Sequence, residues 1–252
     1  MSIKALIRKA KETPTKVPEL DREAEEPEKA LPLPSLPTPV EVAGPVRRVR
    51  LAEAWLPKDA EEIILNNLHR RQSDFRLLRT KRTARFGGDP GPPFVPEPLP
   101  HWLSAICMAV GAAADLAPTP NHVLVNHYQP GQGILPHTDG PAYAPWAAIV
   151  SLGSAVVFEF WRDHAHVAGS EPPALSLLVP PRSLLVFSEE AYSRRLHGIA
   201  ERPSDDVQGV ANASLVEASQ SGAWRTRQLR ADGSLAREER YSLTIRHVPR
   251  TP

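Results

Sequence analysis

Two residues near the middle of the chain could bind a metal ion together. His137 and Asp139 are separated by one residue and follow a turn rich in glycine and glutamine. In an extended chain, side chains at i and i+2 point to the same face, so one imidazole and one carboxylate can reach one point. Two histidines and one carboxylate on one face of the metal hold Fe(II) and leave coordination positions open. The pair therefore predicts two of the three ligands of such an iron site.

The third ligand must come from a histidine later in the chain. The candidates are His164, His166, His197 and His247. His197 lies on a predicted strand and precedes a glycine, which lets another backbone segment approach closely. His164 and His166 lie in a polar loop, where histidines are usually solvated, and His247 lies near the end of the domain. We therefore expect His197 to complete the site.

The last predicted strand offers a site for an anion. Arg240, Ser242, Thr244 and Arg246 alternate with apolar residues and share one face of this strand. Two guanidinium groups are costly to bury without an anion, and arginine binds carboxylates through paired hydrogen bonds. The polar outer face of an edge strand would have the same pattern. The metal-binding pattern upstream favours an inward face that binds a dicarboxylate co-substrate.

A basic segment, residues 70–88, precedes these motifs. It contains seven Arg and Lys residues and one acidic residue, and Phe75 and Phe86 flank its basic part. Dense positive charge attracts phosphates, and an aromatic ring can stack on a base. A solvated basic hairpin would have the same composition. The side chains that we expect to contact nucleic acid are Arg76, Arg79, Lys81, Arg82 and Arg85.

The elements that must position these residues follow from apolar periodicity. Two helices are predicted, over residues 55–71 and 99–116, the first with a proline near its start and carboxylates in its first turn. The β-branched and apolar runs that follow, with Gly and Pro between them, are typical of an antiparallel jelly roll. The strands are predicted at 122–128, 134–138, 147–152, 155–161, 174–179, 183–188, 194–199 and 240–247.

The termini of the domain are set by composition. Residues 1–45 alternate charge with proline and lack aromatic residues, so we expect a disordered tail. Its Leu-Pro repeats could bind a protein partner, although a solvated linker is the favoured interpretation. The remaining residues, 46–252, form one domain, in which the long polar segment 202–238 is expected to be a flexible insert.

Charge and cysteine content restrict the compartment and the partners. The 252-residue chain has a net charge of +1 and one cysteine, Cys107, so it cannot form an internal disulfide. With no signal peptide recognised, we expect a reducing compartment, the cytoplasm and nucleus. No apolar run approaches the length of a membrane span, so we expect no membrane partner. A monomer is expected.

Together these motifs resemble the AlkB family of Fe(II)/2-oxoglutarate-dependent dioxygenases, and within it the branch of AlkB homologue six. The resemblance covers roughly residues 46–250 and is strongest over 121–199 and 240–250. It implies a mainly β (α+β) fold, a double-stranded β-helix with two supporting helices. It implies that His137, Asp139 and His197 bind Fe(II), with 2-oxoglutarate and O2 as co-substrates. The residues that it implies for 2-oxoglutarate are Asn126, Tyr128, Arg240, Ser242 and Arg246.

The same resemblance places the basic segment where AlkB proteins carry a nucleotide-recognition lid, and it departs from the family at one site position. AlkB proteins proper have asparagine where this chain has Ser242. The implied activity is oxidative demethylation of nucleic acid, single-stranded by preference because the target base must leave the stack. One alternative is a hydroxylase or demethylase of proteins with the same iron centre, which the proline-rich tail favours. Another is a nucleic-acid-binding protein of low turnover, which the complete set of ligands opposes.

Overall fold

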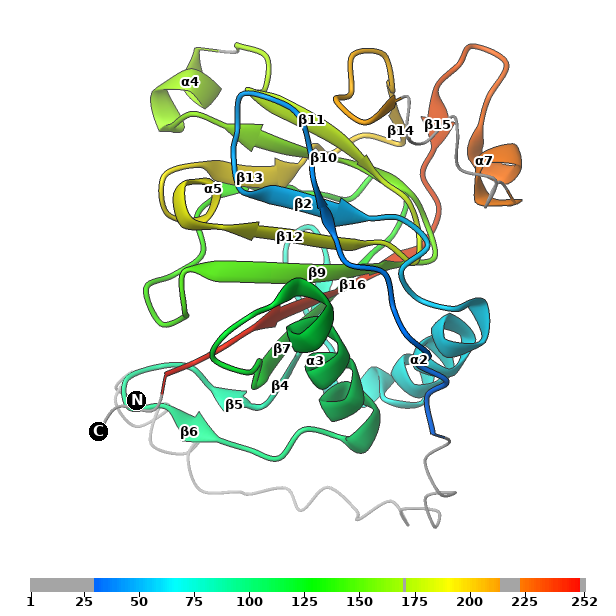
Figure 1. Ribbon diagram of the computed structural model, residues 1–252. Coiled ribbons are helices and arrows are strands. Elements are labelled where there is room, and N and C mark those ends of the chain that lie inside the picture. Colours follow the sequence, from blue (N-terminus) through cyan, green and yellow to red (C-terminus); the bar gives the residue numbers. More distant parts are fainter. Residues whose placement is uncertain (1–29, 170, 214–222, 250–252) are drawn as a thin grey trace, which may run out of the picture.

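Two antiparallel sheets and a pair of helices form three layers (Figure 1). The computed structural model describes residues 30–169, 171–213 and 223–249. The large sheet contains, in spatial order, β1 (Val40–Glu41), β2 (Val49–Ala52), β12 (Leu184–Ser188), β9 (Trp146–Leu152), β16 (Arg240–Arg246), β7 (His122–Tyr128), β4 (Arg82–Phe86) and β3 (Arg76–Leu77). The small sheet contains β11 (Leu175–Val179), β10 (Val156–Trp161), β13 (Leu196–Ile199) and β8 (Ile134–His137). This arrangement confirms the predicted jelly roll.

Helices α2 (Lys58–Arg70) and α3 (His101–Ala114) cover one face of the large sheet (Figure 1). In α2, Asp59 and Glu61 lie in the first turn, where carboxylates are favourable, and Ile64 and Leu68 are fully buried. Residues of α3 such as Leu103 join the same core cluster as the outward-facing residues of β7, β9 and β16. No helix among these described residues is long and apolar enough to cross a membrane.

A second core fills the space between the two sheets. Phe158 and Phe160 of β10 pack there with Ile149 of β9 and Phe187 of β12. Strands expose alternate side chains to opposite faces, so β7 and β16 present apolar residues to the helices and mostly polar ones to this interior. The polar part of the inner face is where the candidate site lies.

Short elements complete the described chain. They are η1 (Gln72–Asp74), β5 (Gly88–Asp89), β6 (Val95–Pro96), α4 (His164–Ala168), α5 (Glu189–Ser193), β14 (Ser204–Asp205), α7 (Ala223–Gln228) and β15 (Leu235–Ala236).

The folded region begins before residue 46. Residues 1–29 of the expected tail lie outside the described residues, but Leu31, Leu33 and Leu36 pack against the helical core. The strand β1 then pairs with β2, which joins this segment to the large sheet. Apolar residues spaced between the prolines can therefore fill a groove, although the proline content suggested only a solvated tail.

The described parts of the 202–238 insert pack against the small sheet, whereas residues 214–222 lie outside the described residues. Val210, Trp224 and Leu235 form a cluster with apolar side chains on the outer side of β10 and β11. Asp205 is 1% exposed and accepts two hydrogen bonds of 2.7 Å from Arg237. These contacts hold the described parts of the insert in place, in contrast to the mobility expected from its composition.

Candidate metal and co-substrate site

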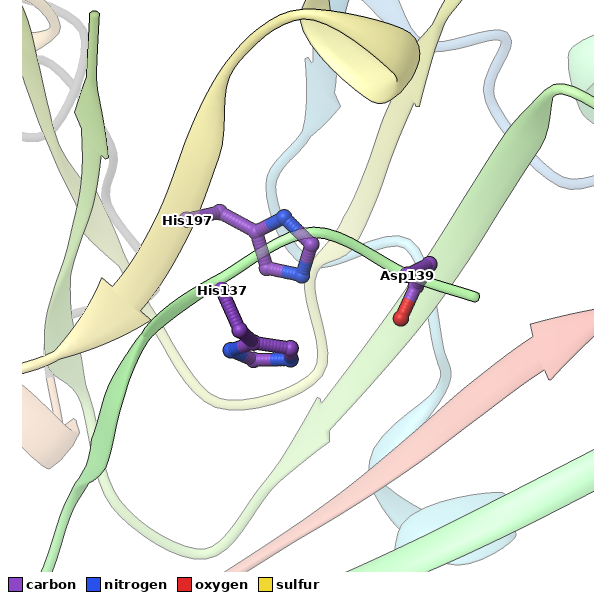
Figure 2. Close-up of side chains that lie close together, drawn as sticks. All are labelled: His137, Asp139 and His197. Atoms are coloured by element: carbon purple, nitrogen blue, oxygen red, sulfur yellow. The ribbon is translucent and has the colours of Figure 1, made fainter. Parts of the chain in front are cut away.

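Three predicted ligands converge at one end of the inner face. His137, Asp139 and His197 each offer one ligand atom, and these atoms lie within 4.8 Å of one another. Figure 2 shows the two imidazole rings side by side, with the Asp139 carboxylate beside them. His137 ends β8 and is the direct cross-strand partner of His197 in β13. The arrangement can hold one metal ion on one face.

A glycine after His197 makes this convergence possible. A Cβ atom at Gly198 would lie 2.7 Å from the carbonyl oxygen of Ile134 and 3.0 Å from the backbone nitrogen of Pro136. The pairing of β13 with β8 also shifts register between His197 and Ile199. Glycine therefore allows the two strands to approach closely where the histidines meet, as expected from the sequence.

Both imidazoles are held in the neutral form that binds metals. The Nδ1–H of His137 donates to the carbonyl oxygen of Leu135 at 2.8 Å, which leaves Nε2 free of a proton. Burial lowers the pKa of His137, and it lowers that of His197 to about 3. The His197 ring packs against Phe158 and Phe187, and its Nδ1 has no hydrogen-bond partner among the described residues.

Asp139 is fixed by an arginine from the large sheet. The Nε atom of Arg246 donates to Oδ2 of Asp139 at 2.9 Å, and Nη2 donates to the other carboxylate oxygen. The Arg246 guanidinium also lies 4.7 Å from the ring centre of Tyr143. In this structure Arg246 therefore orients a candidate metal ligand, and its expected contact with the co-substrate stays a prediction.

Arg240 remains available for an anion. Its side chain is buried, Nε donates to the hydroxyl of Ser151 at 3.0 Å, and Nη1 has no partner among the described residues. Burial lowers its pKa to about 10, so the guanidinium is still charged at neutral pH. A buried charge without a counter-ion is unfavourable, and a carboxylate of a co-substrate would supply one. The unpaired donor therefore fits the dicarboxylate that the sequence predicted.

A polar wall connects Arg240 to the metal ligands. Asn126 lies opposite Ser242 in the pairing of β7 with β16, and it donates to the hydroxyl of Thr244 at 3.2 Å. Tyr128 lies opposite Arg240 in the same register. The residues that line the cavity are Lys81, Leu124, Asn126, Tyr128, Ile134, His137, Ile149, Phe158, His197, Ile199, Arg240, Ser242, Thr244 and Arg246.

Lys81 lies inside this cavity, although the sequence suggested a phosphate contact at the surface. It is 6% exposed, and its Nζ donates to Oδ1 of Asn126 at 2.7 Å. The reason is the register of β4 against β7. Arg82 lies opposite His127 on the outward face of the sheet. Because successive side chains point to opposite faces, Lys81 points inward, into the cavity.

The turn of the hairpin formed by β3 and β4 lies beside the cavity, which Lys81 lines. Thr80 donates to the carbonyl of Gly133 at 3.1 Å, and Arg79 forms an ion pair of 3.5 Å with Glu201. Arg76 is exposed on this hairpin. A groove of about 360 Å³ beside the mouth shares Ile134 and Ile199 with the cavity. The basic segment thus contacts both the cavity and its rim.

Other members of the basic segment do not face the cavity. Arg82 donates to the side chain of Gln72 and lies 5.4 Å from the ring centre of Phe75, while Arg85 pairs with Asp89 at 3.2 Å.

The prediction that Phe75 or Phe86 stacks on a base is wrong. Both rings are only 8% exposed and belong to the core beneath the helices. The apolar side chains that the hairpin does expose are Leu77, at 77%, and Leu78, at 49%.

His122, at the start of β7, is a buried imidazole directly opposite Arg246 in the pairing of β7 with β16. It is fully buried, and its ring centre lies 5.5 Å from that of Tyr143. Burial lowers its pKa to about 4, the positive charges of Arg246 and Arg85 act in the same direction, and Asp89 opposes them. The ring is therefore neutral at physiological pH.

Comparisons with known proteins agree with this geometry. The sequence of this chain matches the protein family described as the 2OG-Fe(II) oxygenase superfamily over residues 52–246. A protein of Danio rerio named "Probable RNA/DNA demethylase ALKBH6" is 37% identical over 208 residues, which cover 78% of this chain and 83% of that protein. A region of the Xenopus tropicalis "tRNA (carboxymethyluridine(34)-5-O)-methyltransferase alkbh8" is 38% identical over 90 residues, which cover 35% of this chain and 13% of that protein.

A solved structure shares the fold. The structure of OsALKBH1 superimposes with a TM-score of 0.50 at 16% identity and covers 79% of this chain and 98% of that chain.

Proposed function

Because this chain belongs to the 2OG-Fe(II) oxygenase superfamily and is AlkB-like, we propose that it demethylates nucleic acid by oxidation. Members of this superfamily use Fe(II) and 2-oxoglutarate with O2, and the chain carries the ligand types that they require. The observation that carries the proposal is that the three candidate metal ligands lie together beside the guanidinium of Arg240, whose Nη1 has no partner among the described residues, in one cavity or at its edge.

In this proposal His137, Asp139 and His197 hold Fe(II), and Arg240 holds one carboxylate of 2-oxoglutarate. Asn126, Tyr128 and Ser242 complete the wall against which the co-substrate lies. Loaded with these groups, the site would supply the oxidation of a substrate C–H bond by O2, with 2-oxoglutarate converted to succinate and CO2. Hydroxylation of an N-methyl group gives an unstable N-hydroxymethyl product that releases formaldehyde.

The residues around the centre keep it oriented and dry. Arg246 fixes both oxygens of Asp139, and the carbonyl of Leu135 fixes the tautomer of His137. The rings of Phe158 and Phe187 exclude water from the buried side of His197. Such support keeps metal ligands in one geometry and tunes their basicity.

Two observations support nucleic acid as the substrate. The 37% identical relative is named as a probable RNA/DNA demethylase. Arg79, which lines the groove beside the cavity, and Arg76, on the same hairpin, are exposed and could contact phosphates. The cavity lies between two sheets, so a target base must leave its stack to enter, and we propose a preference for single strands. We also propose that the protein acts as a monomer in the cytoplasm and nucleus, where such substrates occur.

Action on a protein substrate has weaker support. The part of the proline-rich tail that the structure describes packs on the chain's own core, so this part is engaged internally.

The test of the proposed function is succinate release by the Fe(II)-loaded protein against a panel of methylated single-stranded oligonucleotides and methylated peptides, with Asp139→Ala as control. We expect release with oligonucleotides and none with the variant. Release with peptides alone would contradict the proposal.

A further inference from the structure

The cavity around the candidate metal site carries an excess of positive charge. Lys81, Arg240 and Arg246 line it, and none of its lining residues in the described part of the chain is an aspartate or glutamate. The neighbouring carboxylate, Asp139, is already paired with Arg246. A substrate that enters therefore meets cations and no free carboxylate along the cavity wall.

Lys81 is the cation whose role remains open. Its ammonium group donates to the neutral amide of Asn126 at 2.7 Å and lies 5.5 Å from the ring centre of Tyr128. Burial, together with the charges of Arg246 and Arg240, lowers its pKa to about 8. The nearby charge of Asp139 acts in the opposite direction, the amine is protonated at neutral pH, and no carboxylate of the described residues lies within hydrogen-bond distance of it.

Bound cofactors do not remove this excess. The side chains contribute three positive charges and the one negative charge of Asp139. Fe(II) adds two positive charges and 2-oxoglutarate adds two negative ones. The loaded centre therefore keeps a net charge of two positive units close to the position of the substrate.

Methylated bases differ in their net charge, so a positively charged cavity would bind them with different affinities. Methylation on a ring nitrogen that is an acceptor, as in N1-methyladenine, gives a base that is cationic at neutral pH. Methylation of an exocyclic amine, as in N6-methyladenine, leaves the base neutral. In a buried site of low dielectric, a like charge disfavours the cation strongly, because water screens the repulsion poorly.

We propose that this cavity selects methylated bases that remain neutral, and that Lys81 is the residue that excludes cationic ones. The inference rests on the proposed function and names the class of base that this site accepts. Repulsion between like charges in such a site should give roughly 30-fold discrimination, which is about 2 kcal/mol at 1.4 kcal/mol per tenfold change.

The test compares two oligonucleotides that differ in charge at one base. Single-stranded pentamers of one sequence carry a central N6-methyladenine or N1-methyladenine, and fluorescence anisotropy gives their affinities for protein loaded with Mn(II) and 2-oxoglutarate. The wild type should bind the neutral form roughly 30-fold more tightly. Lys81→Met should bring this ratio towards one, and Lys81→Arg should preserve it. The ratio of kcat/KM values with Fe(II) should follow the same order.

Arg79→Met is the matched control. It removes a positive charge from the same hairpin, but at the exposed rim. It should weaken both oligonucleotides by the same factor and leave their ratio unchanged. A wild type that prefers the cationic base, or a ratio unaffected by Lys81→Met, would overturn the inference alone. Failure to bind or demethylate either oligonucleotide would overturn the proposed function and this inference with it.

Discussion

Replacing Arg240 with methionine should change the stability of the free protein and its affinity for 2-oxoglutarate in opposite directions. In the free protein this guanidinium is buried, donates to the Ser151 hydroxyl, and has no partner for Nη1 within the described part of the chain. Methionine retains much of the aliphatic volume and removes the charge. The variant therefore separates the role of the charge in folding from its role in binding.

The magnitude on folding follows from the pKa. Burial lowers the pKa of Arg240 from 12.5 to about 10, and one pKa unit corresponds to about 1.4 kcal/mol. The charged form therefore costs the folded state roughly 3 kcal/mol. Losing the hydrogen bond to Ser151 offsets about 1 kcal/mol of the gain. We expect the free variant to be more stable by about 1 to 2 kcal/mol, measured by denaturant unfolding.

The magnitude on binding has the other sign. Hydrogen bonds between charged groups contribute about 1.5 to 3 kcal/mol each. Loss of a guanidinium that binds one carboxylate should therefore cost about 3 kcal/mol, or roughly a 100-fold rise in Kd for 2-oxoglutarate. Calorimetric titration of the Mn(II)-loaded protein measures this change directly.

Arg246→Met serves as the contrast. It leaves Asp139 without its paired partner, and breaking a buried ion pair typically costs about 3 to 5 kcal/mol. This variant should therefore be less stable than wild type. The reasoning would be refuted if Arg240→Met lost several kcal/mol of stability while its 2-oxoglutarate affinity stayed unchanged, because Arg240 would then be purely structural.

Three further outcomes are expected. Asp205→Ala should lower the free energy of unfolding by about 3 to 5 kcal/mol, because it leaves the buried guanidinium of Arg237 without its carboxylate partner; an unchanged denaturation midpoint would contradict this. His122 should lower wild-type stability by up to about 3 kcal/mol as pH decreases from about 6.5 to about 4, because the unfolded chain protonates this imidazole before the folded one, whose pKa burial and Arg246 lower to about 4; His122→Phe should remove this part of the pH dependence and leave the part due to His197. Arg76→Ala should reduce the slope of log affinity against log salt by about 0.7 for a single-stranded oligonucleotide, and an unchanged slope would exclude a phosphate contact.

Strand positions and the candidate metal ligands could be predicted because both depend on local patterns. Strand β7 spans His122–Tyr128 as the alternation predicted, and β16 spans Arg240–Arg246. The glycine after His197 also indicated a close approach of two backbones before the contact with Ile134 was known. Each of these features is encoded within a few neighbouring residues.

Features that depend on pairing between distant strands could not be predicted from the sequence. Lys81 and Arg82 are adjacent cations, and only the pairing of β4 with β7 places one in the cavity and the other on the outer face. Arg240 and Arg246 share one strand face, yet only the loop that carries Asp139 gives Arg246 a partner. Composition also failed for Phe75, whose position between basic residues concealed its place in the core.

The most direct test of the central claim is nucleoside analysis of a methylated single-stranded oligonucleotide after incubation with the protein, Fe(II), 2-oxoglutarate and O2. The account predicts loss of the methyl group in equal amount to the succinate formed. It predicts no loss with Asp139→Ala, which lacks a candidate metal ligand. Succinate formation with every methylated base left intact would contradict the claim that this site demethylates nucleic acid.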